Sequence, residues 1–412
     1  MKLVMLAGCF APEQSADTHL NVDMAEDFAR YGAEVTVVVP FPARGVTPQI
    51  QKAYLDKRDE VINDRLHILR VGKPDTFHRN LLLRGLALLK NSWLLYRTGK
   101  KLDADAYFIL SSPPFLGYVG ALLARRAPVF YKLQDLFPDS LLHAKGLREA
   151  HPAIRLLRGL ERLVYRRVTQ IHVVSEDMKT TLLARGVPEE KMRVVLNWID
   201  EHACVPVARK ENPLFEQFGL SREGFYVCYA GNIGLLQNVE TILKAAVVLE
   251  QKAPEITFVI IGDGAWKPEM DAFLRDHLLS NVKVFPMQPV QAVSQVYSLG
   301  DVDLVSLKPG VTKMAMPSKT WSILSAARPV ICEIDLDSGL RAMAEEGAWG
   351  VCVASGDAEA LADAILAFYK MPQAEREAMG QRGRDYIEAH LTRGVSTKLH
   401  IALVQELLKN RG

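Results

Sequence analysis

The 412-residue sequence lacks the features that mark metal-clustered, disulfide-bonded and membrane-spanning proteins. Its five cysteines are dispersed without a CxxC pair, so we expect neither a zinc cage nor a disulfide framework, and a reducing compartment fits. No stretch approaches the ~18 uninterrupted apolar residues that a membrane span needs. The formal net charge is only +2, which argues against a strongly charged nucleic-acid-binding protein.

What the sequence does contain is enough apolar residues for more than one core. Hydrophobic residues make up 49% of the chain, and its length suits two or three domains. Charge is unevenly spread, because residues 1–200 hold 29 basic and 22 acidic side chains while the remainder is net acidic. The first half is therefore expected to favour anionic partners.

Short apolar runs alternate with helical patterns along the chain, which is typical of βαβ units and parallel sheets. Helical faces are predicted at 21–31 and 238–252. Buried strands are predicted at 3–6, 35–39, 106–110, 129–133 and 171–174, and again at 226–230, 257–261, 282–285, 303–307, 330–333 and 351–353. The sequence thus predicts an α/β fold with two doubly wound halves.

The polar, irregular stretch 197–212 is the best linker candidate. We expect one domain at 1–200, a second at 201–385, and a helical segment at 386–412 that packs back on the first. Residues 6–9 resemble a lipoprotein cleavage box, but the segment before Cys9 is too short for an ordinary export signal and is read as the first strand. Because parallel sheets bind ligands at the carboxyl ends of their strands, two such halves predict a ligand cleft between them.

A glycine-rich segment, YAGNIG at 229–234, stands where a predicted strand ends and a helix begins. Glycines there allow backbone N–H groups to approach an anion, and the following helix dipole favours negative charge. The spacing differs from GxGxxG, so a dinucleotide fingerprint is not supported. A tight strand-to-helix turn without a ligand is the alternative interpretation.

A second segment, MPSKT at 316–320, opens another predicted helix, which we expect to reach about residue 327. Ser318 suits the N-cap, and Lys319 in the first turn is unfavourable beside the positive end of a helix dipole. That cost is explained if Lys319 and the helix end share an anion, although an exposed surface lysine would look the same. Asp263, after another strand, could line the same pocket or only cap a turn.

Together these motifs resemble the family 4 glycosyltransferases, whose fold is the two-domain GT-B arrangement. The resemblance covers nearly the whole chain and also includes APE at 11–13, RYGAEVTV at 30–37, VVS at 173–175 and NWID at 197–200. A narrower similarity, SSPP at 111–114 and YKLQDLFPDS at 131–140, is to the branch of bacterial N-acetyl-L-fucosamine transferases of surface-polysaccharide assembly.

The resemblance implies sugar transfer from a nucleotide sugar, expected to be UDP-linked, usually with retention and without a metal or other cofactor. The second domain would bind the donor and the first the acceptor. Carried over residue by residue, the donor-binding positions are Gly231, Asn232, Ile233, Gly234, Gln237, Asp263, Met287, Pro317, Ser318, Lys319, Thr320 and Ser338. The acceptor-binding positions are Pro12, Glu13, Ser112, Gln134 and Asp135.

The sequence departs from the family in one respect that concerns the donor. Typical members carry two glutamates eight positions apart, and the aligned residues here are Met314 and Ser322. The second glutamate usually holds the ribose, so that contact is expected from Asp337 or Ser338. The usual lysine after the glycine motif is also missing, with Gln237 near its place. Lys319 must therefore carry more of the diphosphate charge.

Asp135 and Lys319 are the residues that we expect to be catalytic. Lys319 would stabilise the leaving diphosphate, and Asp135 would accept a proton from the acceptor hydroxyl or orient it. Asp135 could instead be a cap or turn residue, and Glu13 is a weaker candidate. The Asp301-Val302-Asp303 segment mimics a DxD metal site but is expected to be the start of a strand.

Residues 78–102 combine leucines, aromatic residues and basic residues, as an interfacial helix does. Arg155, Arg158, Arg162 and Arg166 add a basic stripe with helical spacing. We expect a cytoplasmic protein that can contact the inner face of the cytoplasmic membrane, although a core helix with a solvated basic edge is the alternative.

Other functions remain open. A non-hydrolysing nucleotide-sugar epimerase shares the fold, and the missing glutamates are compatible with a degenerate nucleotide-binding scaffold. A dehydrogenase is disfavoured by the absence of the glycine fingerprint. His19 is near the first loop and could reach the cleft.

Overall fold

The computed structural model describes residues 1–13, 15, 17–73, 81–139, 151–313 and 316–410. These residues form two compact units, one made of residues 1–197 and 394–412 and the other of residues 198–393. The chain returns to the first unit at Gly394, later than the expected residue 386. Among the described helices, none is both long and apolar enough to cross a bilayer.

The first unit is built on an eight-stranded sheet with the order β3-β4-β2-β1-β5-β6-β7-β8. All neighbours are parallel except β3 and β4, which form an antiparallel hairpin at the edge that the sequence pattern did not reveal. Its elements are β1 (Lys2–Leu6), α1 (Thr18–Arg30), β2 (Glu34–Pro40), α2 (Pro48–Ala53), β3 (Asp59–Asn63), β4 (Leu66–Val71), α3 (Leu81–Gly99), β5 (Ala106–Leu110), α4 (Leu116–Leu123), β6 (Val129–Leu133), α6 (Pro152–Arg167), β7 (Gln170–Val173), α7 (Glu176–Ala184), a 3-10 turn (Glu189–Lys191), β8 (Met192–Val194) and α16 (Arg393–Lys409).

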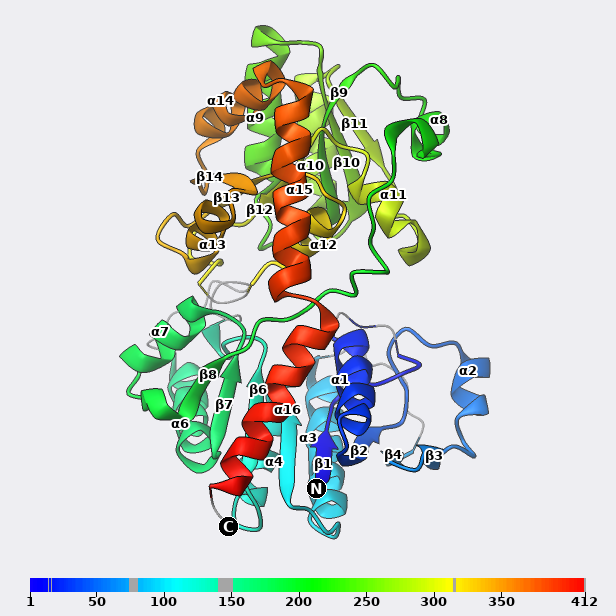
Figure 1. Ribbon diagram of the computed structural model, residues 1–412, viewed down its shortest axis with the longest axis vertical. Coiled ribbons are helices and arrows are strands. Elements are labelled where there is room, and N and C mark those ends of the chain that lie inside the picture. The colour runs from blue at the N-terminus through cyan, green and yellow to red at the C-terminus, as the bar shows by residue number, and fades with distance from the viewer. Residues whose placement is uncertain (14, 16, 74–80, 140–150, 314–315, 411–412) are drawn as a thin grey trace. The chain divides into compact units, whose positions relative to one another are not determined.

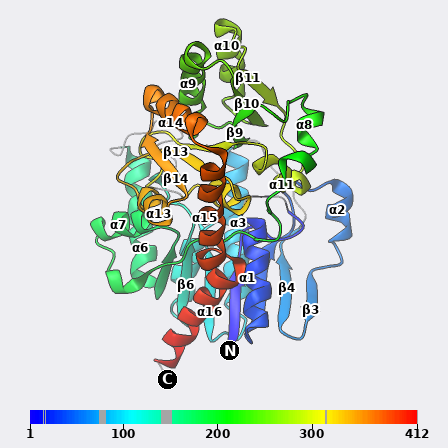
Figure 2. The same ribbon diagram turned by 45° about the horizontal axis from the view of Figure 1, so that its top comes forward.

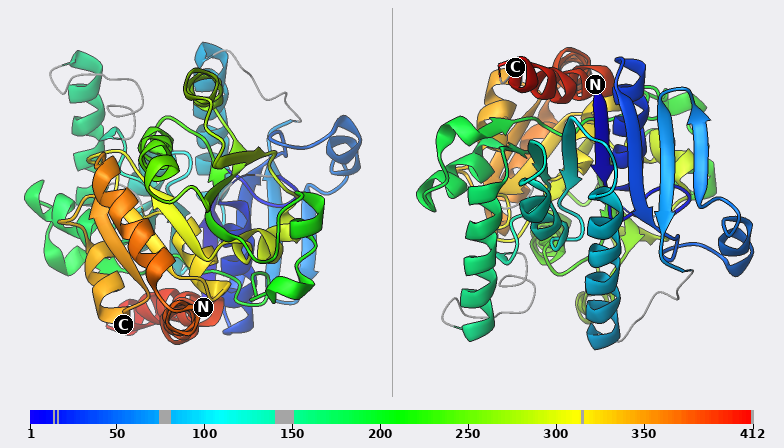
Figure 3. Two further views of the ribbon diagram at one scale, coloured as in Figure 1. Left: turned by 90° about the horizontal axis from the view of Figure 1, so that it is seen from above. Right: turned by 90° about the horizontal axis from the view of Figure 1, so that it is seen from below.

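Helices cover both faces of this sheet, as a parallel sheet requires. α1 and α16 lie side by side on one face (Figures 1 and 2). On the opposite face α4 packs against both α3 and α6, and α3 and α6 extend away from the sheet in the same direction (Figure 3). The central strands are accordingly apolar on both sides, and all five residues of β5 and of β6 are buried.

The second unit has a six-stranded, wholly parallel sheet with the order β11-β10-β9-β12-β13-β14. Its elements are 3-10 turns at Arg209–Glu211 and Val290–Ala292, α8 (Leu214–Gln217), β9 (Phe225–Asn232), α9 (Val239–Lys252), β10 (Ile256–Asp263), α10 (Lys267–His277), β11 (Val282–Phe285), α11 (Val293–Tyr297), β12 (Val302–Ser306), α12 (Lys319–Ser325), β13 (Val330–Ile334), α13 (Gly339–Gly347), β14 (Gly350–Ala354), α14 (Ala358–Lys370) and α15 (Gln373–His390).

Two layers of helix enclose this second sheet. α9 packs against α10 and α14, and α12 packs against α11 and α15. A core of strand residues from β9, β10 and β12 and apolar residues of α9 and α14 fills the space on one side. The predicted α/β fold with two doubly wound parallel sheets is confirmed.

The C-terminal region, where a helical segment was expected at 386–412, contains two helices, α15 and α16, that meet at Leu391 and Thr392. At this break the helices contact the chain segment that leaves the first unit. The N–H of Ile199 donates to the carbonyl oxygen of Leu391 at 3.1 Å, and Ile199 forms a parallel bridge with Thr392. α16 is then tied into the first unit by Thr397, whose hydroxyl donates to the buried Asp27 carboxylate at 2.8 Å.

Candidate functional site

The glycine-rich segment of the second unit lies at the carboxyl end of β9, between the ends of β10 and β12. Gly231 has a φ of +129° and Gly264 a φ of +159°, both in a region that favours glycine. A Cβ on Gly264 would lie 2.3 Å from the carbonyl oxygen of Ile233, so the two loops approach through bare backbone. The sequence prediction that Asp263 and the glycine segment share one edge is consistent with this packing.

Hydrogen bonds lock the two loops together. The N–H of Ile233 donates to the carbonyl oxygen of Asp263 at 2.8 Å, and the N–H of Trp266 donates to the carbonyl oxygen of Ile233 at 2.9 Å. The Asp263 carboxylate accepts from the N–H of Gly264 at 2.8 Å, so Asp263 does cap a turn. Ile233, one of the residues expected to bind the donor, is fully buried and packs in the hydrophobic core beneath the bend.

Lys319 is the cation that the fold places against this bend. Its Nζ would lie only 3.3 Å from a Cβ on Gly231, and it lies 3.6 Å from the centroid of the Tyr229 ring. The Nζ atom is buried, and no residue that the structure describes forms a hydrogen bond with it. Burial lowers the pKa of Lys319 to about 7, and the Asp303 carboxylate opposes that shift.

The helix that follows is shorter than predicted. α12 ends at Ser325 instead of about residue 327, because Ala327 takes a left-handed conformation with a φ of +52° just before Arg328 and Pro329. Ser318 precedes the helix, but its side chain makes no capping hydrogen bond. The N–H of Thr320 donates to the carbonyl oxygen of Pro317 at 3.1 Å. With only seven residues in α12, the positive charge here comes mainly from the Lys319 ammonium group.

A buried carboxyl group, that of Glu333, forms a hydrogen bond with the residue that precedes α9. Glu333 of β13 accepts from Asn238 Nδ2 at 2.7 Å and from the N–H of Gly356, and its other oxygen meets the Ser306 hydroxyl. Burial raises the pKa of Glu333 to about 7 against these hydrogen bonds. Within the loop above, Asn232 donates to the side-chain oxygen of Gln237 at 3.3 Å.

The remaining residues expected on the donor side follow other strands of the same sheet. Met287 follows β11 and is half exposed. Ser338 precedes α13 and is buried, and its hydroxyl has no hydrogen-bond partner among the described residues. Asp337, the other expected ribose ligand, pairs with Lys313. Met314, aligned with the first missing glutamate, is outside the described residues.

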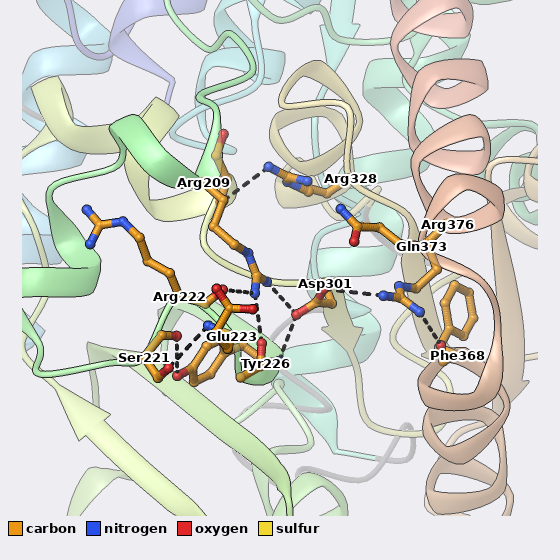
Figure 4. A network of polar contacts seen from close by, with 12 residues as sticks. Arg209, Ser221, Arg222, Glu223, Tyr226, Asp301, Arg328, Phe368, Gln373 and Arg376 are labelled. Atoms are coloured by element: carbon orange, nitrogen blue, oxygen red, sulfur yellow. Dashed lines mark hydrogen bonds and ion pairs between the residues drawn. The ribbon is translucent and has the colours of Figure 1, made fainter.

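Asp301 belongs to an arginine network (Figure 4). Its carboxylate accepts from Arg209 at 2.6 Å and from the N–H of Tyr226 at 2.9 Å, and Arg376 lies 3.6 Å away. Asp303 is fully buried inside β12, and burial raises its pKa well above the ordinary range. Their positions around the start of a strand are those that the sequence predicted.

In the first unit, the predicted acceptor residues follow the central strands β1, β5 and β6. The N–H of Gln134 donates to the Ser111 hydroxyl at 2.9 Å, and the Gln134 side-chain oxygen accepts from Asn197 at 2.7 Å. Asn197 in turn accepts from the Nζ of the buried Lys132 at 2.6 Å. The carbonyl oxygen of Ser112 accepts from the N–H of Gly8 at 3.2 Å, which joins the ends of β5 and β1.

Asp135 follows directly after this cluster. The residue as a whole is exposed, but neighbouring atoms partly desolvate its carboxyl group, which raises the pKa of Asp135 to about 6, and the Asp17 carboxylate adds to the shift. A carboxyl group with this pKa can exchange a proton near neutral pH. Asp17 was not singled out in the sequence, because a carboxylate beside a helix start looks like an ordinary cap.

Glu13 forms hydrogen bonds with the backbone of a neighbouring loop. One of its oxygens accepts from the N–H groups of Ala43 and Arg44 at 2.8 and 2.9 Å, and it thereby fixes the loop after β2. Burial raises the pKa of Glu13 despite these bonds. Pro12 is half-buried beside it. His19 lies in the first turn of α1, and burial lowers its pKa while Lys132 contributes to the same shift.

Lys132 and two histidines, His172 and His400, are buried, and the sequence pattern gave none of them a role. Burial lowers the pKa of Lys132 to about 7, and the Asp17 carboxylate opposes this shift. The pKa of His172 is lowered mainly by burial and further by the positive charge of Lys132. His172 of β7 and His400 of α16 meet through their Nδ1 atoms at 2.7 Å. The position of Lys132 within the apolar run YKL was a signal in the sequence for a buried cation. The histidine pair had no such signal, because its two residues are 228 positions apart.

Both halves of the chain match known protein families. Residues 21–198 match the Glycosyl transferase 4-like domain, and residues 210–386 match the Glycosyl transferases group 1 family. WbjE of Pseudomonas aeruginosa, assigned as a glycosyltransferase, is 23% identical over 380 residues, which cover 91% of this chain and 90% of WbjE. WcaI of Escherichia coli K12, assigned as a colanic acid biosynthesis glycosyl transferase, is 24% identical over 401 residues, or 95% and 96% of the two chains.

Solved structures share the architecture at lower identity. Anabaena HepE, whose structure was solved in complex with UDP and glucose, superposes with a TM-score of 0.72 at 16% identity. The match covers 98% of this chain and 100% of HepE. At this identity the likeness concerns the fold.

Proposed function

The chain belongs to the family 4 glycosyltransferases with the GT-B fold, and on that premise we propose that it transfers a sugar from a nucleotide-sugar donor to an acceptor in cell-surface polysaccharide synthesis. The donor nucleotide is UDP, as in the HepE complex. The sugar is N-acetyl-L-fucosamine or another acetamido sugar, and the acceptor is a lipid-linked or free oligosaccharide of an O-antigen or capsule. The motifs at 111–114 and 131–140 support the sugar class, and the name of WcaI supports a polysaccharide pathway.

The observation that carries this proposal is the Lys319 ammonium group beside the Gly231 bend. A buried cation with no anionic hydrogen-bond partner among the described residues is costly unless a ligand supplies the opposite charge. The backbone of the glycine loop and the Lys319 Nζ can together hold the two phosphates of a nucleotide sugar. The donor would therefore bind in the second unit, with its base toward Met287 and its ribose toward Ser338.

The reaction breaks the bond between the anomeric carbon and the diphosphate oxygen and forms a bond from that carbon to the acceptor oxygen. Lys319 stabilises the negative charge that develops on the leaving diphosphate. The acceptor hydroxyl loses its proton to Asp135, whose raised pKa suits a proton acceptor near neutral pH. We propose retention of the anomeric configuration, with no protein nucleophile, and acceptor contacts from Gln134 and Ser112.

A membrane-facing side of the first unit fits a lipid-linked acceptor. Leu86 and Trp93 of α3 are 64% and 56% exposed, and Arg97 lies over the Trp93 ring at 5.3 Å. α6 extends in the same direction (Figure 3). Its Leu156 is 65% exposed. Of the predicted interfacial stretch 78–102, residues 78–80 and the side chains of 81–84 are outside the described part. We propose a cytoplasmic protein that docks peripherally on the anionic inner leaflet.

A stepwise assay tests the function. UDP, GDP and ADP are first compared by thermal shift, and UDP is expected to stabilise the protein most. UDP-N-acetyl-L-fucosamine is then incubated with and without a prenyl-diphosphate-linked acetamido sugar, with and without EDTA. We expect acceptor-dependent UDP release that survives EDTA. Epimerised donor without acceptor would identify the epimerase alternative, and UDP binding without any turnover on a panel of acceptors would favour the scaffold alternative.

Docking is tested separately with vesicles. The protein should sediment with phosphatidylglycerol vesicles at low salt and much less with phosphatidylcholine vesicles. Leu86→Glu with Trp93→Glu should abolish sedimentation, while Val61→Glu, which charges an exposed apolar position on β3, should not. Equal sedimentation of all three proteins would contradict the docking face.

A further inference from the structure

A large basic groove lies in the first unit between α6 and the loop after α7, and the four arginines of the predicted basic stripe are among its lining residues. Its volume is about 1010 Å³. Its charged lining residues are Arg155, Arg158, Arg162, Arg166, Arg185, Lys191, Asp139 and Glu161. Six cations thus face two carboxylates. We propose that this groove binds a diphosphate ester carried by the acceptor, which deepens the proposed function and rests on it.

The floor of the groove is held rigid by paired arginines. Arg158 donates to the two oxygens of Asp139 at 2.6 and 2.8 Å, and Arg185 donates to the same two oxygens at 3.0 and 2.7 Å. Glu161 lies 3.4 Å from Arg158 and accepts from the Tyr165 hydroxyl at 2.8 Å. The two carboxylates therefore hold two guanidinium groups in place. Each guanidinium group has more N–H donors than Asp139 can accept.

The other arginines of the groove have no such carboxylate partners in the described part of the chain. Arg155, Arg162 and Arg166 are exposed on successive turns of α6, and no acidic side chain that the structure describes forms an ion pair with any of them. Lys191 adds a further charge while its Nζ is held by carbonyl oxygens at the end of α6, at 2.8 Å from that of Arg166. Like charges crowded on one wall repel each other, and a bound anion relieves that repulsion.

Charge and size indicate the class of ligand. Arginine is the side chain best suited to phosphate, because its planar fork matches two oxygens at once. A surplus of four positive charges suits a diphosphate better than a carboxylate or a neutral sugar. The volume is that of a site for a whole small molecule and is far larger than one phosphate needs. The ligand is therefore a diphosphate joined to a larger group.

The groove adjoins the proposed acceptor site. Glu161 and Tyr165 line both the groove and a small neighbouring pocket whose wall includes Asp135 and Ser111. A sugar with its hydroxyl near Asp135 could thus extend its diphosphate toward Arg162 and Arg166. The groove residues belong to the first unit, whereas the Gly231 bend and Lys319 belong to the second.

The test uses the full chain saturated with UDP, so that the donor site is already occupied. Inorganic pyrophosphate and monomeric farnesyl diphosphate are titrated by calorimetry at low and moderate salt. We expect one further binding event that weakens with salt, and a loss of at least about tenfold in affinity in Arg162→Gln with Arg166→Gln. Arg275→Gln, which removes an exposed arginine from α10, is the matched control and should bind normally.

The outcomes separate the two proposals and the two sources of diphosphate. Tighter binding of farnesyl diphosphate than of pyrophosphate identifies a lipid-borne ester, and equal binding identifies a soluble one. No second event with UDP bound, or unchanged affinity in the double variant, overturns the groove assignment while leaving donor binding intact. If UDP itself does not bind but pyrophosphate binding still depends on Arg162 and Arg166, the groove stands and the proposed function fails.

Discussion

The ammonium group of Lys319 lies 3.6 Å from the centre of the Tyr229 ring, directly beside the bend at Gly231. A cation at this distance gains a cation–π attraction, but that attraction replaces only part of the hydration that burial removes. The Asp303 carboxylate opposes the shift in the pKa of Lys319, yet neither group forms a hydrogen bond with any residue that the structure describes. The residue is thus held partly uncompensated at the place where we propose that a diphosphate binds.

Replacing Lys319 should weaken donor binding. In Lys319→Met we expect the Kd for UDP to rise by about 10- to 100-fold, because one charge-assisted contact to the diphosphate is lost. Calorimetry measures the change, with Lys252→Met at the far end of α9 as the matched control. An unchanged Kd in Lys319→Met, together with native circular dichroism, would exclude Lys319 from the donor site.

UDP binding should also take up a proton. Free Lys319, with a pKa of about 7, is mostly neutral at pH 8, and a bound diphosphate should make it fully charged. About 0.9 proton per UDP is therefore expected at pH 8, measured from the binding enthalpy in buffers of different ionisation enthalpy. Lys319→Met should abolish this uptake. The stability of Lys319→Met relative to the natural protein should improve as the pH falls from about 10 to 7 and stay level below that, because over this range the unfolded lysine is protonated while the folded one is neutral.

Asp135→Asn should affect turnover more than binding. The natural enzyme should gain activity as the pH rises through about 6, because only the ionised carboxylate accepts a proton. In the variant we expect kcat to fall by about 100-fold or more and this limb of the pH profile to disappear, with the Kd for UDP unchanged. Steady-state kinetics from pH 5 to 8 decide the matter, and a variant with normal kcat would remove Asp135 from the mechanism.

Glu333→Gln should change how stability depends on pH. The folded-state pKa of Glu333, about 7, is above the ordinary value, so its favourable contribution is complete at low pH and is lost as the pH rises through 7. Glutamine keeps an acceptor for Asn238 and cannot ionise. Relative to the natural protein, Glu333→Gln should therefore gain about 2–3 kcal/mol between pH 5 and pH 8. Parallel pH dependence of the two proteins in denaturant unfolding would contradict this.

Thr397→Val should destabilise the first unit by about 1–3 kcal/mol, because the hydroxyl that donates to the fully buried Asp27 is lost without a change in shape. Urea unfolding of Thr397→Val and Thr397→Ser gives a matched pair. The serine variant retains the hydroxyl and should be the more stable of the two. If valine is tolerated as well as serine, this hydrogen bond does not hold α16 in place.

The geometry of the proposed donor site could be predicted from the sequence further than that of the proposed acceptor site. The segment at 229–234 and Lys319 are nearly ninety residues apart, yet their association follows from a rule, because parallel strands all present their carboxyl ends to one edge. The helix at 319 was predicted too long, since the left-handed turn at Ala327 has no glycine to reveal it. The hairpin of β3 was missed because Asp59–Asn63 is an exposed edge strand with little apolar pattern.

The sequence by itself determined the strands, the two halves, the glycine bend and the family. These features depend on the spacing of apolar residues and on the positions of glycines, which act over a few neighbouring residues. Tertiary structure alone decided which charges become buried or paired. The Arg158–Asp139–Arg185 cluster, the meeting of His172 with His400 and the isolation of Lys319 each depend on segments far apart in the chain. A pKa or an ion pair reflects the surroundings of a side chain, and those surroundings exist only after the chain has folded.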